Sequence, residues 1–167
     1  RSTAMASLED QPIRRLPTGS GEFDRVLGGG LVPGSLVLVG GDPGIGKSTL
    51  LLQSASTMAA QTSVLYVSAE ESAQQVKLRW QRLAGGPSDL QLLAETDLEL
   101  VLEELEALRP DVAIIDSIQA LHDANLPSAP GSVGQVRECA AALQRLAKRQ
   151  TTACLLYTSD AADEHTG

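Results

Sequence analysis

The stretch "GGDPGIGKST" at residues 40–49 decides the fold that we predict for this chain. It contains the spacing Gly-x-x-x-x-Gly-Lys-Ser, whose glycines let backbone N–H groups face a phosphate. The preceding residues 35–41, "SLVLVGG", are apolar on both faces and predict a buried strand, and a helix is expected over about 47–60. A strand, a glycine-rich loop and a helix in this order predict a phosphate-binding loop, because the positive end of the helix dipole then meets the anion.

The residue types in this loop suit a nucleotide with a metal ion. Lys47 is expected to reach the β- and γ-phosphates, and the Ser48 hydroxyl is expected to hold Mg²⁺. The sequence therefore predicts ATP and Mg²⁺ as cofactors, against the alternative of a glycine-rich turn with a solvent-exposed lysine. The predicted nucleotide-binding residues are Gly41, Asp42, Pro43, Gly44, Ile45, Gly46, Lys47, Ser48 and Thr49.

Outside this loop, apolar runs alternate with amphipathic segments. The pattern predicts βαβ units, a mainly parallel sheet and flanking helices, and thus an α/β fold. Thr96 and Glu99 have the spacing of a capping box at the start of one helix. The expected strands are 62–68, 90–95 and 111–117, and the expected helices are a short one within 22–35 and others at about 71–84, 97–108 and 135–149.

Three carboxylates follow buried strands. Asp116 ends the strand "VAIID", where parallel strands present ligands, so it is expected to bind Mg²⁺, with a turn cap as the alternative. Glu70 and Glu71 follow the strand "VLYVS". We predict that Glu70 activates the water that attacks the γ-phosphate. Ser68 and Glu71 also have the spacing of a capping box, so Glu71 is expected to cap the next helix or to assist catalysis.

The composition argues against several classes of protein, namely strongly basic nucleic-acid binders, disulfide-rich or zinc proteins and membrane proteins. The 167 residues carry a net charge of −8, which argues against binding to nucleic acid by bulk charge alone. Cys139 and Cys154 make neither a disulfide framework nor a zinc pair, and His122 and His165 stand apart from other metal ligands. No apolar run approaches the roughly 20 residues that span a bilayer, so we expect no membrane contact and, by elimination, a cytoplasmic location.

Five segments together resemble the RadA (Sms) family of bacterial RecA-like ATPases. They are "RLPTGSGEFDRVLGGGLVPGS", "GGDPGIGKSTLLLQ", "LYVSAEES", "AIIDSIQ" and "SAPGSVGQVRECAAALQRLAK". The resemblance runs from about Pro12 to Ala153 and implies a RecA-like P-loop core, a homo-hexameric ring and ATP-driven branch migration on single-stranded or branched DNA. It implies a RecA-type recombinase as a further partner. Lys47, Glu70 and Glu71 would then be the catalytic residues, and Ser48 and Asp116 the metal ligands.

The resemblance places the loop after Asp116, "HDANLPSAPGSVGQ", against DNA in the ring channel. The loop contains no Lys or Arg, so its contacts would come from backbone amides, small side chains or Arg137. A mobile surface loop is the alternative. Trp80 is expected to be a partly buried helix residue, with a position beside the adenine as the alternative.

The end of the chain departs from the family. The family pattern expects a core strand from about Thr151, whereas residues 154–164, read back into codons, resemble the transposase adapter used in preparing sequencing libraries. We therefore expect an arm over 1–17, a partial RecA-like domain over 18–153 and a non-native tail over 154–167, with a sheet that is incomplete and ends in an unpaired apolar edge. The alternative is a divergent strand followed by an acidic tail.

The family's zinc module, Lys-Asn-Arg-Phe-Gly segment and Lon-like domain are absent from the sequence. We therefore expect the 167 residues alone to bind ATP weakly without acting as a motor. Two other functions stay open for the whole protein. One is a KaiC-like signalling ATPase with paired glutamates, and the other is a nucleotide-dependent scaffold without productive turnover.

Overall fold

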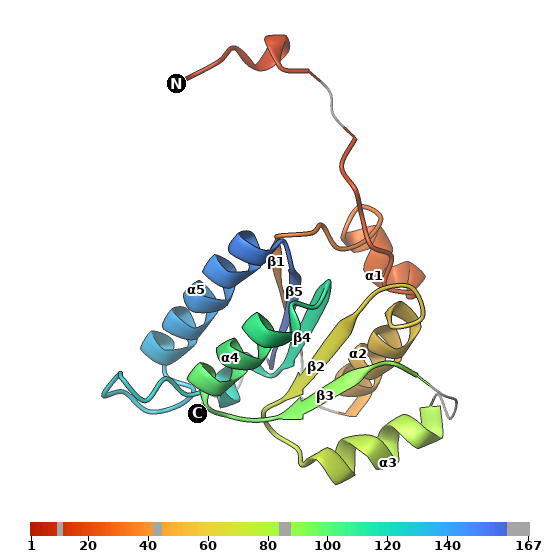
Figure 1. The fold of residues 1–167 in the computed structure, drawn as a ribbon, viewed down its shortest axis with the longest axis vertical. Coiled ribbons are helices and arrows are strands. Elements are labelled where there is room, and N and C mark those ends of the chain that lie inside the picture. The colour runs from red at the N-terminus through yellow and green to blue at the C-terminus, as the bar shows by residue number, and fades with distance from the viewer. Residues whose placement is uncertain (10–11, 42–44, 84–87, 160–167) are drawn as a thin grey trace.

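The computed structural model describes residues 1–9, 12–41, 45–83 and 88–159, with the side chains of 45–47 and 159 excepted. Five strands make one sheet in the order β1-β5-β4-β2-β3, and every pairing in it is parallel (Figure 1). The α/β fold predicted from the sequence is confirmed. The strands are β1 (Leu36–Gly41), β2 (Val64–Ser68), β3 (Gln91–Ala94), β4 (Val112–Asp116) and β5 (Ala153–Ser159).

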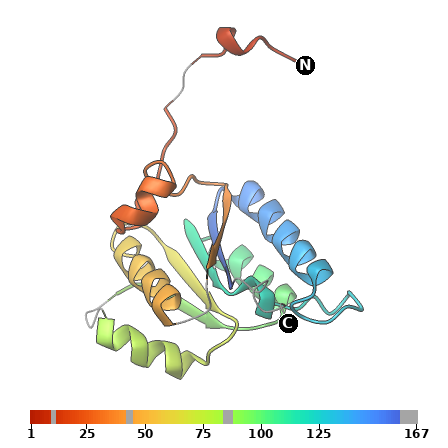
Figure 2. The same cartoon turned by 180° about the vertical axis from the view of Figure 1, so that it is seen from behind.

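Helices cover both faces of the sheet (Figures 1 and 2). The α4 and α5 helices pack on one face, where Val101, Leu105 and Leu143 are fully buried. The α2 and α3 helices pack on the other, where Leu51, Leu52 and Val76 are buried against the sheet. The helices are α1 (Gly21–Val26), α2 (Ile45–Met58), α3 (Ala73–Leu83), α4 (Leu98–Leu108) and α5 (Val133–Gln150), with short 3₁₀ turns η1 (Met5–Ser7) and η2 (Ile118–Ala120).

The central strands are buried on both faces, as their continuous apolar runs predict. All residues of β2 and β4 are buried, and alternate residues enter opposite cores. Leu65 and Ile115 pack under α4 and α5, whereas Tyr66 and Ile114 pack under α2 and α3. Asp116 lies two residues after Ile114, so its side chain points to the same face of the sheet, the one covered by α2, the helix that follows the phosphate loop.

Residues 153–159 form a strand inside the sheet. Strand β5 lies between β1 and β4, and Cys154, Leu155 and Leu156 are fully buried. The boundary expected after residue 153 falls just inside this strand, and the division into an arm, a partial domain and a tail stays a prediction. The apolar, β-compatible composition of "CLLYT" explains why it fits there. The adapter origin of the sequence stays a prediction, and residues 160–167 lie outside the described residues.

The outer side of β1 is unpaired within the described part of the chain. Leu38 on this strand is 56% exposed. The edge expected from the sequence was at the strands missing after residue 153, whereas β5 fills that place beside β4. Among the described strands, β1 pairs only with β5, in a register that joins Leu36 to Cys154 and Gly41 to Ser159.

Two capping predictions were wrong in detail. Asp97, rather than Thr96, caps α4, because its carboxylate accepts a hydrogen bond from the Glu99 N–H at 2.9 Å. For α3, Ser72 and Gln75 make the reciprocal capping bonds, at 3.2 and 2.9 Å. In both cases the sequence offers two polar residues at suitable spacing, and the chain uses the one nearer the helix.

The N-terminal segment extends away from the body (Figure 1). Residues 1–9 are exposed, but Leu16, assigned by sequence to the arm, is buried and exchanges backbone hydrogen bonds with Leu31 at 2.7 and 2.8 Å. Among the described helices, none is long and apolar enough to cross a membrane.

Candidate functional site

The carboxyl ends of the parallel strands gather the predicted site residues at one edge of the sheet. Strand β1 ends at Gly41, immediately before the phosphate loop, and β4 ends at Asp116. Strand β2 ends at Ser68, which is in register with Asp116, and the two glutamates follow it. A ligand at this edge would meet all three segments, as ligands of open α/β sheets do.

The phosphate loop itself is described only at its ends. Asp42, Pro43 and Gly44 lie outside the described residues. The backbone of residues 45–47 forms the first turn of α2, but the side chains of Ile45 and Lys47 also lie outside the description. Ser48 and Thr49 follow in the same helix and are half-buried. The order of strand, loop and helix is therefore as predicted, and the reach of Lys47 stays a prediction.

Asp116 is held in a buried position by hydroxyl groups. Its side chain is 7% exposed, and its Oδ2 accepts a hydrogen bond from the Tyr66 hydroxyl at 3.0 Å. The Ser48 hydroxyl lies beside this carboxyl group, close enough to favour its charged form. Burial raises the pKa of Asp116 above its usual 3.8, although the hydroxyl groups of Ser48 and Tyr66 act in the opposite direction. The two residues bring the first turns of α2 and the end of β4 together, and a metal ion shared between them stays a prediction.

These residues fit Mg²⁺. The ion prefers hard oxygen ligands and is usually bound by one or two carboxylates together with substrate phosphates. Asp116 and Ser48 supply a carboxylate and a hydroxyl at one place, and a cation there would offset the cost of a buried carboxylate. The described residues contain no group of three or more His, Cys, Asp and Glu side chains suited to an all-protein metal cage.

The two glutamates after β2 have different surroundings. Glu70 is exposed, and its Oε2 accepts a very short hydrogen bond from the hydroxyl of Ser117, the residue after Asp116. Glu71 instead makes an ion pair of 2.6 Å with Arg79 of α3, whose side chain is 16% exposed. Its backbone N–H donates to the Ser68 hydroxyl at 3.1 Å. Glu70 is thus the glutamate whose carboxylate faces solvent beside Asp116, whereas Glu71 anchors α3.

Three residues at this edge were missed by the sequence reasoning: Tyr66, Ser117 and Arg79. The sequence held one signal for Tyr66. It lies two residues before Ser68 in β2, so its side chain points to the same face of the sheet, the face covered by α2. Ser117 directly follows Asp116, the last residue of β4, so its position beside the site could have been predicted from the end of that strand. The Arg79 contact with Glu71 spans eight residues and depends on how α3 turns back, which periodicity does not reveal.

The loop after β4 is fixed by a buried amide. Gln135 of α5 is fully buried, and its side chain accepts from the Asp123 N–H at 2.9 Å. The same side chain donates to the carbonyls of Asp123 and Ser128, at 3.1 and 2.9 Å. These three bonds tie Asp123 and Ser128 to the start of α5, and both the DNA-facing loop and the mobile surface loop stay predictions.

Trp80 lies away from the phosphate loop. Its indole N–H donates to the Ser56 hydroxyl at 3.0 Å, about two turns along α2 from Ser48. The indole is half-buried, as expected for a partly buried helix residue, and this contact does not support a place beside the adenine.

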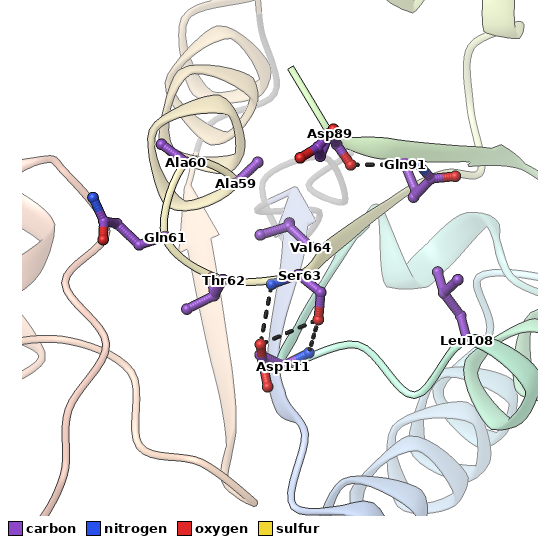
Figure 3. A pocket seen from close by; sticks show the side chains of 10 residues that line it. All are labelled: Ala59, Ala60, Gln61, Thr62, Ser63, Val64, Asp89, Gln91, Leu108 and Asp111. Carbon is purple, nitrogen blue, oxygen red and sulfur yellow. Dashed lines mark hydrogen bonds between the residues drawn. The ribbon is translucent and has the colours of Figure 1, made fainter.

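A cavity of about 490 Å³ lies at the opposite edge of the sheet (Figure 3). It is lined by the amino ends of the strands, including Val64, Gln91 and Asp111. Figure 3 shows Asp111 turned toward Ser63, whose hydroxyl and backbone N–H both donate to Asp111 Oδ2, at 3.1 and 3.0 Å. These bonds join the loops that precede β2 and β4, so the cavity is separate from the phosphate site.

Comparison with known proteins places this geometry among ATPase folds. The family model described as "AAA domain" matches residues 5–158. The chain is 50% identical over 157 residues to the DNA repair protein RadA of Listeria monocytogenes, covering 93% of this chain and 34% of that protein. It is 57% identical over 153 residues to RadA of Synechocystis, covering 81% of this chain and 30% of that protein. The chain thus spans about a third of the length of these curated relatives.

Solved structures share the fold. A DnaB-like replicative helicase, solved with its interactions with primase, superposes with a TM-score of 0.72 at 16% identity, over 95% of this chain and 48% of that one. A KaiC-like protein from the archaeon Pyrococcus horikoshii gives a TM-score of 0.65 at 21% identity, over 89% of this chain and 71% of that one. At these identities the likeness concerns the fold alone.

Proposed function

The chain belongs to the AAA domain family and is RadA-like in sequence, and from this premise we propose that it is the ATP-binding part of a DNA repair and recombination ATPase. The proposed activity is Mg²⁺-dependent ATP hydrolysis, stimulated by DNA in the whole protein. The observation that carries it is the meeting of Ser48 and Asp116 in a buried setting at the carboxyl edge of the sheet.

Each residue at this edge has a part in the proposed reaction. Bound ATP and Mg²⁺ would supply a γ-phosphate made open to attack by the metal's charge. Ser48 and Asp116 would hold the metal, and Lys47 would neutralise the phosphate oxygens. Glu70 would take a proton from the attacking water, and its exposed carboxylate beside Asp116 supports that role. Ser117 would keep the Glu70 carboxylate at the end of β4.

The DNA substrate rests on the RadA-like sequence. We propose single-stranded or branched DNA, a homo-hexamer that drives branch migration, and a RecA-type recombinase as a partner, in a cytoplasmic protein. The net charge of −8 means that contacts in this part would be local rather than a broad basic surface. The loop over 123–132, held by Gln135, offers backbone amides for such contacts, and Arg137 on α5 offers a charge.

The test uses the 167-residue chain together with the longer protein that contains it. We expect a fluorescent ATP analogue to bind both in the presence of Mg²⁺, and ATP turnover in the longer protein to rise when single-stranded DNA is added. For the 167 residues alone we expect binding without turnover that responds to DNA. Turnover in the longer protein that ignores DNA favours a KaiC-like signalling ATPase, and binding without turnover favours a scaffold.

Lys47→Ala tests the phosphate loop within the same experiment. Removing the ammonium group leaves only backbone amides on the phosphates, so nucleotide affinity or turnover should collapse. Lys77→Ala on the exposed face of α3 is the matched control, since it removes the same charge away from the loop. Hydrolysis that is unchanged in Lys47→Ala would reject the nucleotide site.

A further inference from the structure

Tyr66 is a buried side chain whose place in the core does not by itself explain its hydroxyl group. The residue is 1% exposed and lies in strand β2, between β4 and β3, under α2 and α3. A buried tyrosine hydroxyl needs a hydrogen-bond partner, and this one has a carboxylate, Asp116, at 3.0 Å. A phenylalanine would fill the same apolar space without that bond, so the hydroxyl points to a second role.

Strand geometry explains how Tyr66 reaches Asp116. In the β2–β4 register Tyr66 pairs with Ile114, and Asp116 lies two residues further along on the same face. Two residues of strand advance about 6.6 Å, which is close to the length of a tyrosine side chain. The ring therefore lies along the sheet toward its carboxyl edge and delivers the hydroxyl to the end of β4.

The bond restrains the carboxylate that the proposed function assigns to Mg²⁺. Tyr66 donates to it from β2 at 3.0 Å, and the Ser48 hydroxyl lies beside it on α2, so the Tyr66 bond fixes the carboxylate next to the other predicted metal ligand. Bonds from a donor to a charged acceptor are stronger than those between neutral groups. A carboxylate has about four lone-pair sites, so the Tyr66 bond leaves others available to a cation.

We propose that Tyr66 is a positioning residue for Mg²⁺, whose hydroxyl holds the Asp116 carboxylate in the orientation that binds the metal beside the nucleotide. The inference rests on the proposed Mg²⁺–nucleotide site. Groups that orient metal ligands typically change metal affinity by about 10- to 100-fold when they are removed. The role therefore predicts a change in metal requirement rather than a loss of nucleotide binding.

The test is Tyr66→Phe, measured with a fluorescent ADP analogue over a Mg²⁺ titration and with Mn²⁺ by electron paramagnetic resonance. We expect the half-saturating Mg²⁺ concentration to rise by roughly 10-fold, while analogue affinity in the presence of a chelator stays at the wild-type value. The control is Ser56→Ala, which removes a hydroxyl from α2, the helix that packs over Tyr66. This hydroxyl bonds Trp80 rather than Asp116. This control should keep the wild-type Mg²⁺ requirement.

A double-mutant cycle separates positioning from packing. If Tyr66 acts through Asp116, Tyr66→Phe should have no further effect on the Mg²⁺ requirement in an Asp116→Asn background. An unshifted requirement in Tyr66→Phe, an equal shift in Ser56→Ala, or a Tyr66→Phe chain that no longer folds would each overturn the inference. A wild-type chain that binds the analogue equally with and without Mg²⁺ would instead reject the proposed metal site.

Discussion

Adjacent glutamates at the end of β2 illustrate how neighbours in sequence come to serve different purposes. Glu71 is tied to Arg79 by a 2.6 Å ion pair and so connects the turn to α3. Glu70 is exposed and is directed toward Ser117 at the end of β4. A general base needs access to water and to the reacting phosphate, and Glu70 satisfies the first of these conditions more fully.

The prediction at the residue scale compares two variants, Glu70→Gln and Glu71→Gln, each of which replaces a carboxylate with an amide. Glu70→Gln should keep Mg²⁺-dependent nucleotide binding and lower ATP turnover in the longer protein by about 10²-fold or more, because an amide cannot accept the proton from water. Glu71→Gln should weaken the bond to Arg79 and cost about 1 kcal/mol or less of unfolding free energy, since the pair is partly exposed. Steady-state ATPase assays and urea melts on both variants measure the two effects. A larger turnover loss in Glu71→Gln would reverse their roles.

The positions of the candidate site residues in the fold were predictable from sequence where a local pattern fixes them. Ser48 follows from the loop spacing, and Asp116 follows from the end of an apolar strand. Tyr66 did not follow, because its contact depends on which strands are neighbours in the sheet. The alternation of strands and helices in the sequence predicts parallel strands, but it does not predict the order in which they lie side by side in the sheet.

At the scale of elements, strand β5 shows what a central strand requires of its sequence. Its six neighbours in β1 and five in β4 are specified by register, and its residues from Ala153 to Tyr157 are buried. These residues match no motif of the family, but a central strand requires only apolar, extended residues of suitable length. Helix ends were predicted to within a few residues, but their caps were not, because several polar residues compete at each start.

Thiol chemistry tests whether β5 forms in solution. Burial raises the pKa of Cys154 to about 12, and burial beside Asp123 and Glu138 raises that of Cys139 to about 11. A raised pKa leaves little thiolate at pH 8, and both thiols are also buried, so neither should react with iodoacetamide under native conditions.

The two cysteines provide an internal comparison. In denaturant both should be alkylated, and peptide mass mapping would show the labelling of each. Fast native labelling of Cys154 with Cys139 still protected would mean that residues 153–159 are not in the sheet. Equal protection of both supports the strand.

At the scale of the whole molecule, the phosphate loop depends on the last described strand. Strand β1 leads into the loop and, within the described part of the chain, is paired in the sheet only with β5. Loss of β5 would therefore leave β1 without backbone partners and uncover the core beneath α2 and α5. The candidate site is local in space but depends on two strands that are far apart in the sequence, β1 and β5.

Two deletions test this dependence. Removing residues 154–167 should abolish the cooperative thermal transition and binding of the fluorescent ATP analogue, because β1 loses its only described partner strand. Removing residues 160–167 should leave both unchanged. Circular dichroism melts and nucleotide titrations on the two variants give the comparison. A cooperative, nucleotide-binding protein after the longer deletion would show that β1 is held by other means.

The pairing of β1 with β5 also bears on how the chain acquires its shape during synthesis. Residues 42–152 separate the two strands, so β1 leaves the ribosome long before its partner is made. At about 5–20 residues per second the delay is on the order of 10 s. Throughout that interval an apolar strand and a glycine-rich loop are unprotected, and only the later strands can pair among themselves. During synthesis, chaperones and proteases therefore have the longest access to the segment that contains the candidate phosphate loop.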